Sequence, residues 1–355
     1  MSRFKIDSNI ISKDGPLYFI ADIGANHDGK INRAFKLIEL AKEAGAHAAK
    51  FQNFTASKIV SKKGFDNLGK QLSHQSNWEK SVYDTYADAS ISLNWTHKLK
   101  EKCDEVGITY FTSPYDHDSV DNVDKFVPAY KIGSGDISWH EILDYIGSKG
   151  KPVFLATGAS TLDEVKVAME VLEKHTEKIV LMQCNTNYTA EKENFKYINL
   201  NVLKTYKSNF PNVILGLSDH THGHATVVGA VALGARVFEK HFTDDNNRLG
   251  PDHKFAMNPN SWIKMVNTAN EVFLSLGNGE KKVEENERET AFLQRRGLTY
   301  KKDLPKGHKL SYNDFFPLRP LNSKGISPSR SNEVVGKKLI NNVKIDDHVT
   351  WEDFE

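Results

Sequence analysis

Two lysines interrupt stretches of this sequence that otherwise have the apolar character of buried strands. Lys50 lies in AHAAKFQ and Lys131 in AYKIGSGD. Burying an ammonium group without a partner is costly, so each lysine requires a carboxylate or an anionic ligand nearby. Two internal salt bridges would satisfy this requirement, and so would a bound anion. KIGSGD also supplies the Ser134 hydroxyl and two glycines that allow the backbone to approach closely, which together suit a phosphate group.

Two histidines end consecutive apolar runs. His220 closes GLSDH and His241 closes VFEKH, so their imidazoles are expected on neighbouring strands, where they could share one divalent ion. The alternative is that each is a hydrogen-bonded core residue. His222 and His224 follow the strand and are assigned turn or capping roles before the next helix. The two cysteines, at positions 103 and 184, lack ligand spacing, so a thiolate zinc site is not expected.

Two aspartates stand beside these groups. Asp22 closes a buried strand in ADIGANHDG, where it could act as a general base or accept a hydrogen bond from a substrate hydroxyl. Its alternative role is to pair with Lys50. Asp136, at the end of KIGSGD, has the same ambiguity. The sequence contains no nucleophile elbow, P-loop or dinucleotide-binding fingerprint.

Eight repeated units supply the elements that would position these side chains. Short β-branched or apolar runs begin near Tyr18, Ala48, Ile108, Ala129, Pro152, Ile179, Val213 and Ala235, and most precede a stretch with helical apolar spacing. In the first unit, Ala34, Leu37, Ile38 and Ala41 share one helical stripe that ends at Gly45. Alternating strands and helices predict parallel pairing with right-handed crossovers, and eight units close into a (β/α)8 TIM barrel. An open, doubly wound α/β sheet is the alternative.

The polar residues of these runs lie at the carboxyl ends of the predicted strands. They are Asp22, Lys50, Gln52, Ser113, Lys131, Ser134, Gln183, Asn185, Ser218, His220 and His241. In a TIM barrel this rim carries the active site. Independent strand assignments therefore indicate one site.

The chain is expected to contain a barrel domain at 1–280, a charged linker at 281–291 and a small β-rich domain at 292–355. A polar stretch at 55–90 interrupts the barrel repeat and is expected to be functional or mobile. The small domain contains an internal repeat, because LSYNDF matches VTWEDF position by position. In both copies a serine or threonine stands three residues before an aspartate, which is typical of a helix start.

Composition excludes several classes of function. The 355 residues include 47 basic and 46 acidic side chains, for a net charge of +1, so no overall charge favours nucleic acid or an anionic membrane. Apolar runs are shorter than a signal peptide core or a membrane span requires. Two cysteines are compatible with a reducing compartment. We therefore expect a cytoplasmic protein.

With these residues assembled, the sequence resembles the sialic acid synthase family along nearly its whole length. The motifs ADIGANHDG, KIGSGD, GLSDHT, EKHFT and GPDH, followed by QRR and LRP, stand in the family's order. The resemblance implies a TIM barrel followed by an antifreeze-like (SAF) domain. It also implies a metal-assisted condensation of phosphoenolpyruvate (PEP) with an N-acetylmannosamine-type hexose, which gives a nonulosonic acid and phosphate by C–O cleavage.

The same resemblance implies roles for individual residues. His220 and His241 would hold a divalent ion, manganese in the first instance with magnesium or cobalt as alternatives. The implied PEP-binding residues are Lys50, Ser113, Lys131, Ser134, Asn185 and Ser218. The implied sugar-binding residues are Gln52, Asp136, Tyr188, Asp252 and Arg319. The implied catalytic residues are Asp22, Lys131, His220 and His241. Arg319 would reach the substrate acyl group from the partner subunit of a domain-swapped homodimer.

Three positions depart from the family pattern and leave the acceptor sugar open. Asp22 and Asp136 stand where glutamate is common, and Thr186 stands where asparagine is common. The acceptor is therefore N-acetylmannosamine or a diacetamido-trideoxyhexose of the legionaminic or pseudaminic type. A PEP-dependent synthase acting on a phosphorylated sugar is an alternative, but it would require a second basic cluster, and none was identified. A non-enzymatic glycan-binding protein is the third hypothesis.

Overall fold

The chain divides into two units between Leu276 and Gly277, and eight parallel strands form the centre of the first unit. The computed structural model describes residues 3–354. The strands are β3 (Tyr18–Asp22), β4 (Ala48–Asn53), β5 (Thr109–Pro114), β6 (Tyr130–Ile132), β7 (Val153–Ala156), β8 (Ile179–Cys184), β9 (Ile214–Asp219) and β10 (Val237–His241). They pair in the order β5-β4-β3-β10-β9-β8-β7-β6, and β5 also lies against β6. This cyclic sequence order confirms the barrel-type prediction, since a doubly wound sheet would reverse its order.

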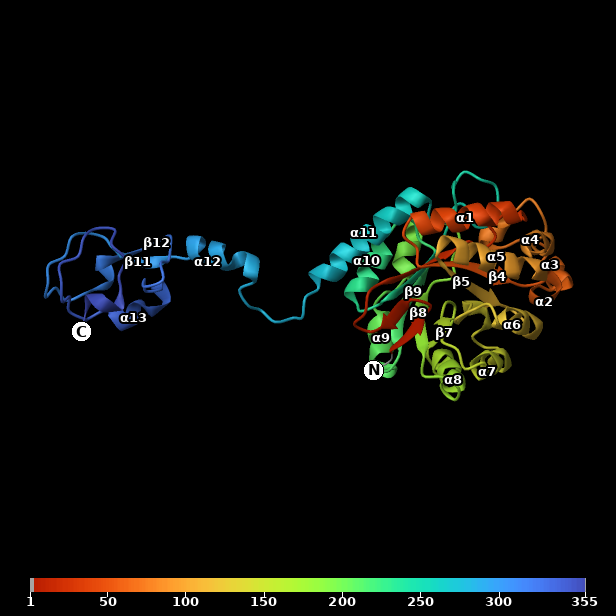
Figure 1. The fold of residues 1–355 in the computed structure, drawn as a ribbon, viewed down its shortest axis with the longest axis horizontal. Helices are drawn as coiled ribbons and strands as arrows, with labels where there is room; N and C mark the ends of the chain where they lie inside the picture. Colours follow the sequence, from red (N-terminus) through yellow and green to blue (C-terminus); the bar gives the residue numbers. More distant parts are fainter. Residues whose placement is uncertain (1–2, 355) are drawn as a thin grey trace. The chain divides into compact units, whose positions relative to one another are not determined.

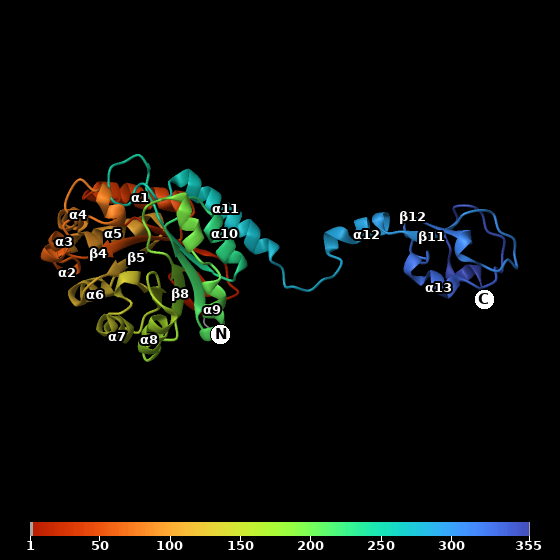
Figure 2. The same ribbon diagram turned by 180° about the vertical axis from the view of Figure 1, so that it is seen from behind.

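Helices surround the sheet (Figures 1 and 2). They are α1 (Ile31–Glu43), α5 (Leu93–Val106), α6 (His117–Asp124), α7 (His140–Ser148), α8 (Leu162–Glu173), α9 (Val202–Asn209), α10 (Ala225–Ala232) and α11 (Pro259–Ser275). The four predicted apolar positions of α1 are its buried face, because residues three and four apart share one side of a helix. Helix α11 begins where Asn258 caps it and Pro259 occupies its first turn.

An antiparallel hairpin closes the amino-terminal end of the barrel. It consists of β1 (Arg3–Ile6) and β2 (Asn9–Ser12). Phe4, Ile6 and Ile11 are buried in one cluster with inward-facing strand residues such as Phe111 and Phe154. The sequence analysis did not identify this hairpin, because two strands of four residues give too short an alternation to stand out.

The stretch at 55–90 forms a small helical layer with a core of its own. Its elements are α2 (Ala56–Ile59), α3 (Lys62–Asn67), the 3₁₀ helix η1 (Ser73–Asn77) and α4 (Val82–Ala89). Ala56, Val60 and Val82 are buried there, and Trp78 and Tyr86 pack against them. Ser61 and Ser81 cap the starts of α3 and α4. A long polar insertion thus becomes ordered through local caps and a few apolar contacts.

The second unit contains the paired strands β11 (Gly297–Tyr300) and β12 (Phe315–Leu318), α12 (Arg288–Gln294) and α13 (Ser331–Val334). The remaining 3₁₀ helices of the chain are η2 (Ser134–Asp136), η3 (Lys192–Tyr197), η4 (Glu285–Glu287), η5 (Tyr312–Asp314), η6 (Pro328–Arg330) and η7 (Trp351–Asp353). Both copies of the predicted repeat start a 3₁₀ helix with a reciprocal cap, Ser311 with Asp314 and Thr350 with Asp353. The limits 1–280, 281–291 and 292–355 stay a prediction. No helix among residues 3–354 has the length and apolar character to cross a bilayer.

Candidate active site

Strand alternation places the polar residues of the barrel interior above its apolar floor. On β10, Val237 belongs to the floor, and Glu239 and His241 follow on the same face toward the carboxyl end. On β9, Ser218 and His220 stand in the same relation to Ile214. Along several strands the inward-facing residues are apolar near the amino-terminal end of the barrel and polar or charged toward the carboxyl-terminal end. The candidate site begins where this change occurs.

Two lysines and two carboxylates form a deep charged layer. Lys50 Nζ lies 2.7 Å from Asp22 Oδ2 and 3.6 Å from Glu239 Oε1, and Lys131 Nζ lies 3.0 Å from the same Glu239 oxygen. All four side chains are at most 5% exposed. The predicted internal salt bridges are therefore present. Ser113 Oγ, also in the barrel, is buried without a hydrogen-bond partner within the described chain, so this layer retains an unused hydroxyl.

Burial and pairing act on these charges in opposite directions. Burial alone would raise the pKa of Asp22, but Lys50 and His241 outweigh it and the net pKa is lowered. Burial alone would lower the pKa of Lys50, but Asp22 and Glu239 outweigh it and the net pKa is raised. Asp22 and Lys50 are thus held as a carboxylate and an ammonium.

The two predicted metal-binding histidines lie together, with ring centroids 5.5 Å apart. His220 Nδ1 is 2.9 Å from the Asn185 carbonyl oxygen, an arrangement that orients a ligand histidine and leaves its other nitrogen available. Burial, with His241 nearby, lowers the pKa of His220 to about 3, so the imidazole is neutral as metal binding requires. His241 Nδ1 is buried without a hydrogen bond and lies 3.6 Å from Asp252 Oδ2.

These donors fit a divalent ion. Within residues 3–354 no group of three or more His, Cys, Asp or Glu side chains forms a ready-made metal site. His220 and His241 would therefore hold the ion, and water or substrate oxygens would complete the coordination.

A cavity of about 370 Å³ opens beside His241. Its lining includes six predicted site residues, namely Gln52, Ser134, Asp136, Tyr188, His241 and Asp252. The sequence analysis missed the opposite wall, which comes from the 55–90 layer and includes Ile59, His74, Trp78, Thr85, Tyr86 and Ala89. Burial raises the pKa of Asp136 to about 6 and raises the pKa of Tyr188 well above its usual value.

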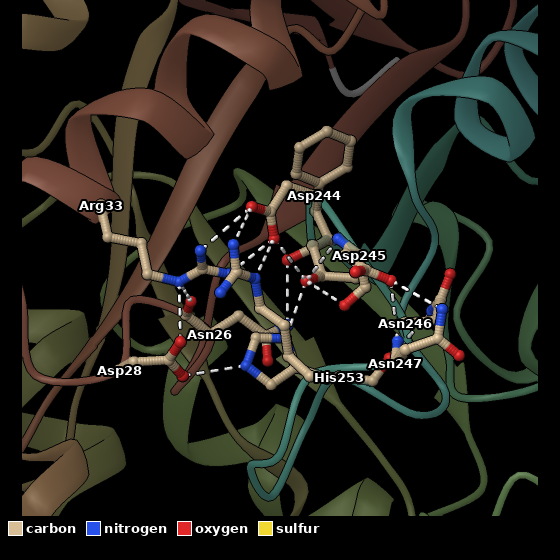
Figure 3. A network of polar contacts seen from close by, with 11 residues as sticks. Asn26, Asp28, Arg33, Asp244, Asp245, Asn246, Asn247 and His253 are labelled. Atoms are coloured by element: carbon tan, nitrogen blue, oxygen red, sulfur yellow. Dashed lines mark hydrogen bonds and ion pairs between the residues drawn. The ribbon is translucent and has the colours of Figure 1, made fainter.

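A polar network holds the loop that carries Asp252 (Figure 3). Arg33 binds both carboxylate oxygens of Asp244, at 3.0 and 2.6 Å, and also pairs with Asp28. The fully buried His253 bridges Thr243 Oγ1 and Asp28 Oδ1. Arg33 and Asp28 come from the segment after β3, so this network joins the β3 and β10 loops and fixes the residue next to Asp252.

A close backbone approach completes the position of Asp252. Its Oδ2 accepts a hydrogen bond from the Ala25 amide at 3.0 Å. Gly24 has a φ of +49°, and a Cβ there would lie 2.6 Å from the same oxygen and 3.0 Å from His241 Nδ1. A side chain at position 24 would therefore displace Asp252 or His241.

Some predicted residues lie elsewhere. The Asn185 side chain is directed toward the Tyr197 carbonyl at 3.4 Å, so its backbone carbonyl rather than its amide reaches His220. Gln183, a predicted rim residue, binds the Ile198 carbonyl. Arg319 is exposed at the end of β12 in the second unit. The sequence analysis also missed Glu239, although its place two residues before His241 in EKHFT could have indicated an inward carboxylate.

Charged side chains at the carboxyl ends of barrel strands, with two neighbouring histidines of which His241 lines a cavity, are typical of the active site of a TIM-barrel enzyme and suit anions and a divalent ion. Comparison with known proteins specifies the family. The NeuB family matches residues 37–281 and the SAF domain matches residues 295–355, so the chain belongs to the NeuB family and carries a SAF domain.

Individual relatives agree with this assignment. The chain is 34% identical to the N,N'-diacetyllegionaminic acid synthase of Legionella pneumophila, over 95% of this chain and 94% of the relative. It is 31% identical to a pseudaminic acid synthase of Campylobacter jejuni, over 96% and 98%. Among solved structures, N-acetylneuraminic acid synthetase from Leptospira borgpetersenii superposes with a TM-score of 0.72 at 26% identity, over 81% of this chain and 94% of the other. These similarities confirm the predicted family and fold.

Proposed function

We propose that this protein condenses PEP with an N-acylated hexosamine to give a nonulosonic acid and inorganic phosphate. The observation that carries the proposal is the convergence of Lys50 and Lys131 beneath a cavity lined by Asp136, His241 and Asp252. The lysines suit a small dianionic substrate, and the carboxylates suit the hydroxyl and amide groups of a sugar. The names of the relatives, which are legionaminic and pseudaminic acid synthases, support the same reaction.

The protein's own groups account for the binding steps. Lys50 and Lys131 neutralise the carboxylate and phosphate of PEP in a buried layer, where charge stabilisation is worth more than in solution. Ser113, Ser134 and Ser218 supply hydroxyl donors around them. The bound divalent ion would polarise the aldehyde of the open-chain sugar.

The reaction then proceeds on PEP. Its methylene carbon attacks the aldehyde carbon, and water adds to C2, the carbon that bears the phosphate oxygen. Cleavage of the C2–O bond releases inorganic phosphate. The aldehyde oxygen gains a proton as it becomes a hydroxyl group, and the water that adds to C2 loses one. Asp22, whose Oδ2 lies 3.5 Å from His241 Nε2, would accept the proton from this water.

We propose a diacetamido-trideoxyhexose of the legionaminic type as the preferred acceptor. One wall of the cavity is largely apolar, because Phe54, Ile59, Trp78, Tyr86 and Ala89 line it. A methyl group at C6 and a second N-acetyl group match such a wall better than two hydroxyl groups. Among the described residues that line the cavity there is no lysine or arginine, which disfavours a phosphorylated sugar.

Three further features belong to the proposal. Manganese is the proposed ion, with magnesium or cobalt as substitutes. The active form would be a homodimer in which Arg319 of one subunit contacts the acyl group in the other. The reaction would take place in the cytoplasm, where PEP is produced.

The test is phosphate release from PEP with manganese and a panel of sugars. The panel contains N-acetylmannosamine, its 6-phosphate, diacetamido-trideoxyhexoses, arabinose 5-phosphate and erythrose 4-phosphate. We expect chelator-sensitive release that is fastest with a diacetamido-trideoxyhexose. Lys131→Met should abolish release, and Lys125→Met, at an exposed position nearby, should not.

The panel also separates the alternatives. Release only with a phosphorylated sugar would replace this proposal with the phosphosugar synthase. Sugar binding without release, in protein that holds manganese and PEP, would favour the glycan-binding hypothesis.

A further inference from the structure

Glu239 lies between the two lysines of the deep charged layer. Its Oε1 atom is 3.0 Å from Lys131 Nζ and 3.6 Å from Lys50 Nζ, and it accepts a hydrogen bond from Ser218 Oγ at 3.4 Å. The side chain is 4% exposed and comes from β10, whereas its three partners come from β6, β4 and β9. Groups from three other strands thus converge on one carboxylate oxygen.

The two carboxylates of the layer have different partners. Asp22 is the nearer counter-ion of Lys50, at 2.7 Å, and it is also held by Gln52 and by the Gly24 amide. Glu239 is the carboxylate that pairs with Lys131. Removing its charge would leave Lys131 a buried cation without its counter-ion, and an ammonium in that state moves toward water or loses its proton.

The second oxygen of Glu239 makes no such contact. Oε2 is buried and has no hydrogen-bond partner within the described chain. The carboxylate is therefore engaged through one oxygen only, and its polar contacts are the groups that converge on that atom.

We propose that Glu239 is a positioning residue for PEP. Glu239 holds Lys50, Lys131 and Ser218 around one carboxylate oxygen. It thereby sets the distance between the two ammonium groups that bind the carboxylate and the phosphate of PEP. PEP carries these two anionic groups on adjacent atoms of a three-carbon skeleton, so it requires two cations held close together. Glu239 acts through the lysines and does not react. The inference rests on the proposed function, in so far as PEP is the anion bound.

Equilibrium binding of PEP to the full-length protein, measured by calorimetry without sugar, tests the proposal. We expect Glu239→Gln to weaken PEP binding at least about tenfold, the scale on which losing one partner of a buried charge pair acts. Glu239→Asp keeps the charge and should recover part of the affinity. Glu170→Gln is the matched control, since Glu170 is exposed on α8 and should leave PEP binding unchanged.

A double-mutant cycle separates positioning from a general structural effect. If Glu239 acts through Lys131, the double variant Lys131→Met/Glu239→Gln should bind PEP no more weakly than Lys131→Met alone. The double variant removes both charges, so it also gives a readout if Glu239→Gln does not fold. Additive losses, or Glu239→Gln binding within about twofold of wild type, would overturn the proposal. A wild-type protein that binds no PEP would refute the proposed function instead.

Discussion

Asp136 is expected to reduce the stability of the barrel at neutral pH. Burial raises its pKa from 3.8 to about 6 in the folded protein. Between these values the folded chain holds a proton that the unfolded chain has lost, so the contribution of Asp136 to stability is present below about pH 4 and is lost as pH rises through about 6. A shift of about two units corresponds to at most about 3 kcal/mol at pH 7 and above.

Asp136→Asn should therefore stabilise the protein in a pH-dependent way. At pH 7.5 we expect a gain of about 1–3 kcal/mol in the free energy of unfolding, and a rise of about 3–8 °C in the melting temperature of the barrel. At pH 4 the gain should be close to zero. The assay is urea and thermal unfolding at both pH values, with Asp66→Asn, an exposed carboxylate on α3, as the control. Equal gains at pH 4 and pH 7.5 would refute the reasoning, since they could not arise from the charge. Loss of sugar turnover in Asp136→Asn would show that the destabilising carboxylate at position 136 is retained because the reaction requires it.

Three further predictions follow from other parts of the structure. Lys240 and Asp219, both about 1% exposed, form a buried ion pair across β10 and β9. Lys240→Met should therefore lower the free energy of unfolding in urea by about 3–5 kcal/mol. The double variant Lys240→Met/Asp219→Leu should recover part of this stability, because it no longer buries an unpaired carboxylate. His220→Ala should abolish manganese binding by calorimetry and phosphate release together, whereas His222→Ala should change neither. Arg319→Ala should preserve PEP binding and remove turnover of the sugar, and a loss of PEP affinity would count against the proposed acyl contact.

The fold could be predicted because the barrel repeats one signal eight times. Each strand is a short apolar run, and each helix has apolar residues that recur with a period of 3.6 residues. An error at the boundary of one element does not change the number of strand–helix units. The hairpin of β1 and β2 was missed because it occurs once and is short. The 55–90 layer was predicted as an insertion, but its packing brings residues from its two ends together, such as Ala56 and Tyr86, and no helical or strand periodicity indicates such a contact.

The site was predictable where it depended on strand ends and less so where it depended on side-chain direction. Lys50, Lys131 and both histidines were predicted from their place at strand ends, and each also has the parity of an inward-facing strand position. Asn185 and Gln183 share the outward parity of Leu181, and their side chains bind the Tyr197 and Ile198 carbonyls, so their place at a strand end does not bring them into the barrel interior. Glu239 was not predicted, although it stands two residues before His241 in EKHFT and therefore has the same inward parity.

The four carboxylates of the site divide into two pairs with different tasks. Asp22 and Glu239 are committed to Lys50 and Lys131, so their contacts lie beneath the cavity. Asp136 and Asp252 line the cavity, and the raised pKa of Asp136 reflects burial without a compensating cation. An aspartate at position 136 withdraws its carboxylate by one methylene compared with the glutamate common in similar sequences. Asp136 lines the same cavity as Trp78 and Tyr86, so a second N-acyl group would have more room there. Asp22 belongs to the buried pair, so having an aspartate instead of a glutamate there should affect the lysine layer and not the choice of sugar. We therefore expect Asp136→Glu to shift the sugar preference toward N-acetylmannosamine, and we expect Asp22→Glu to leave this preference unchanged.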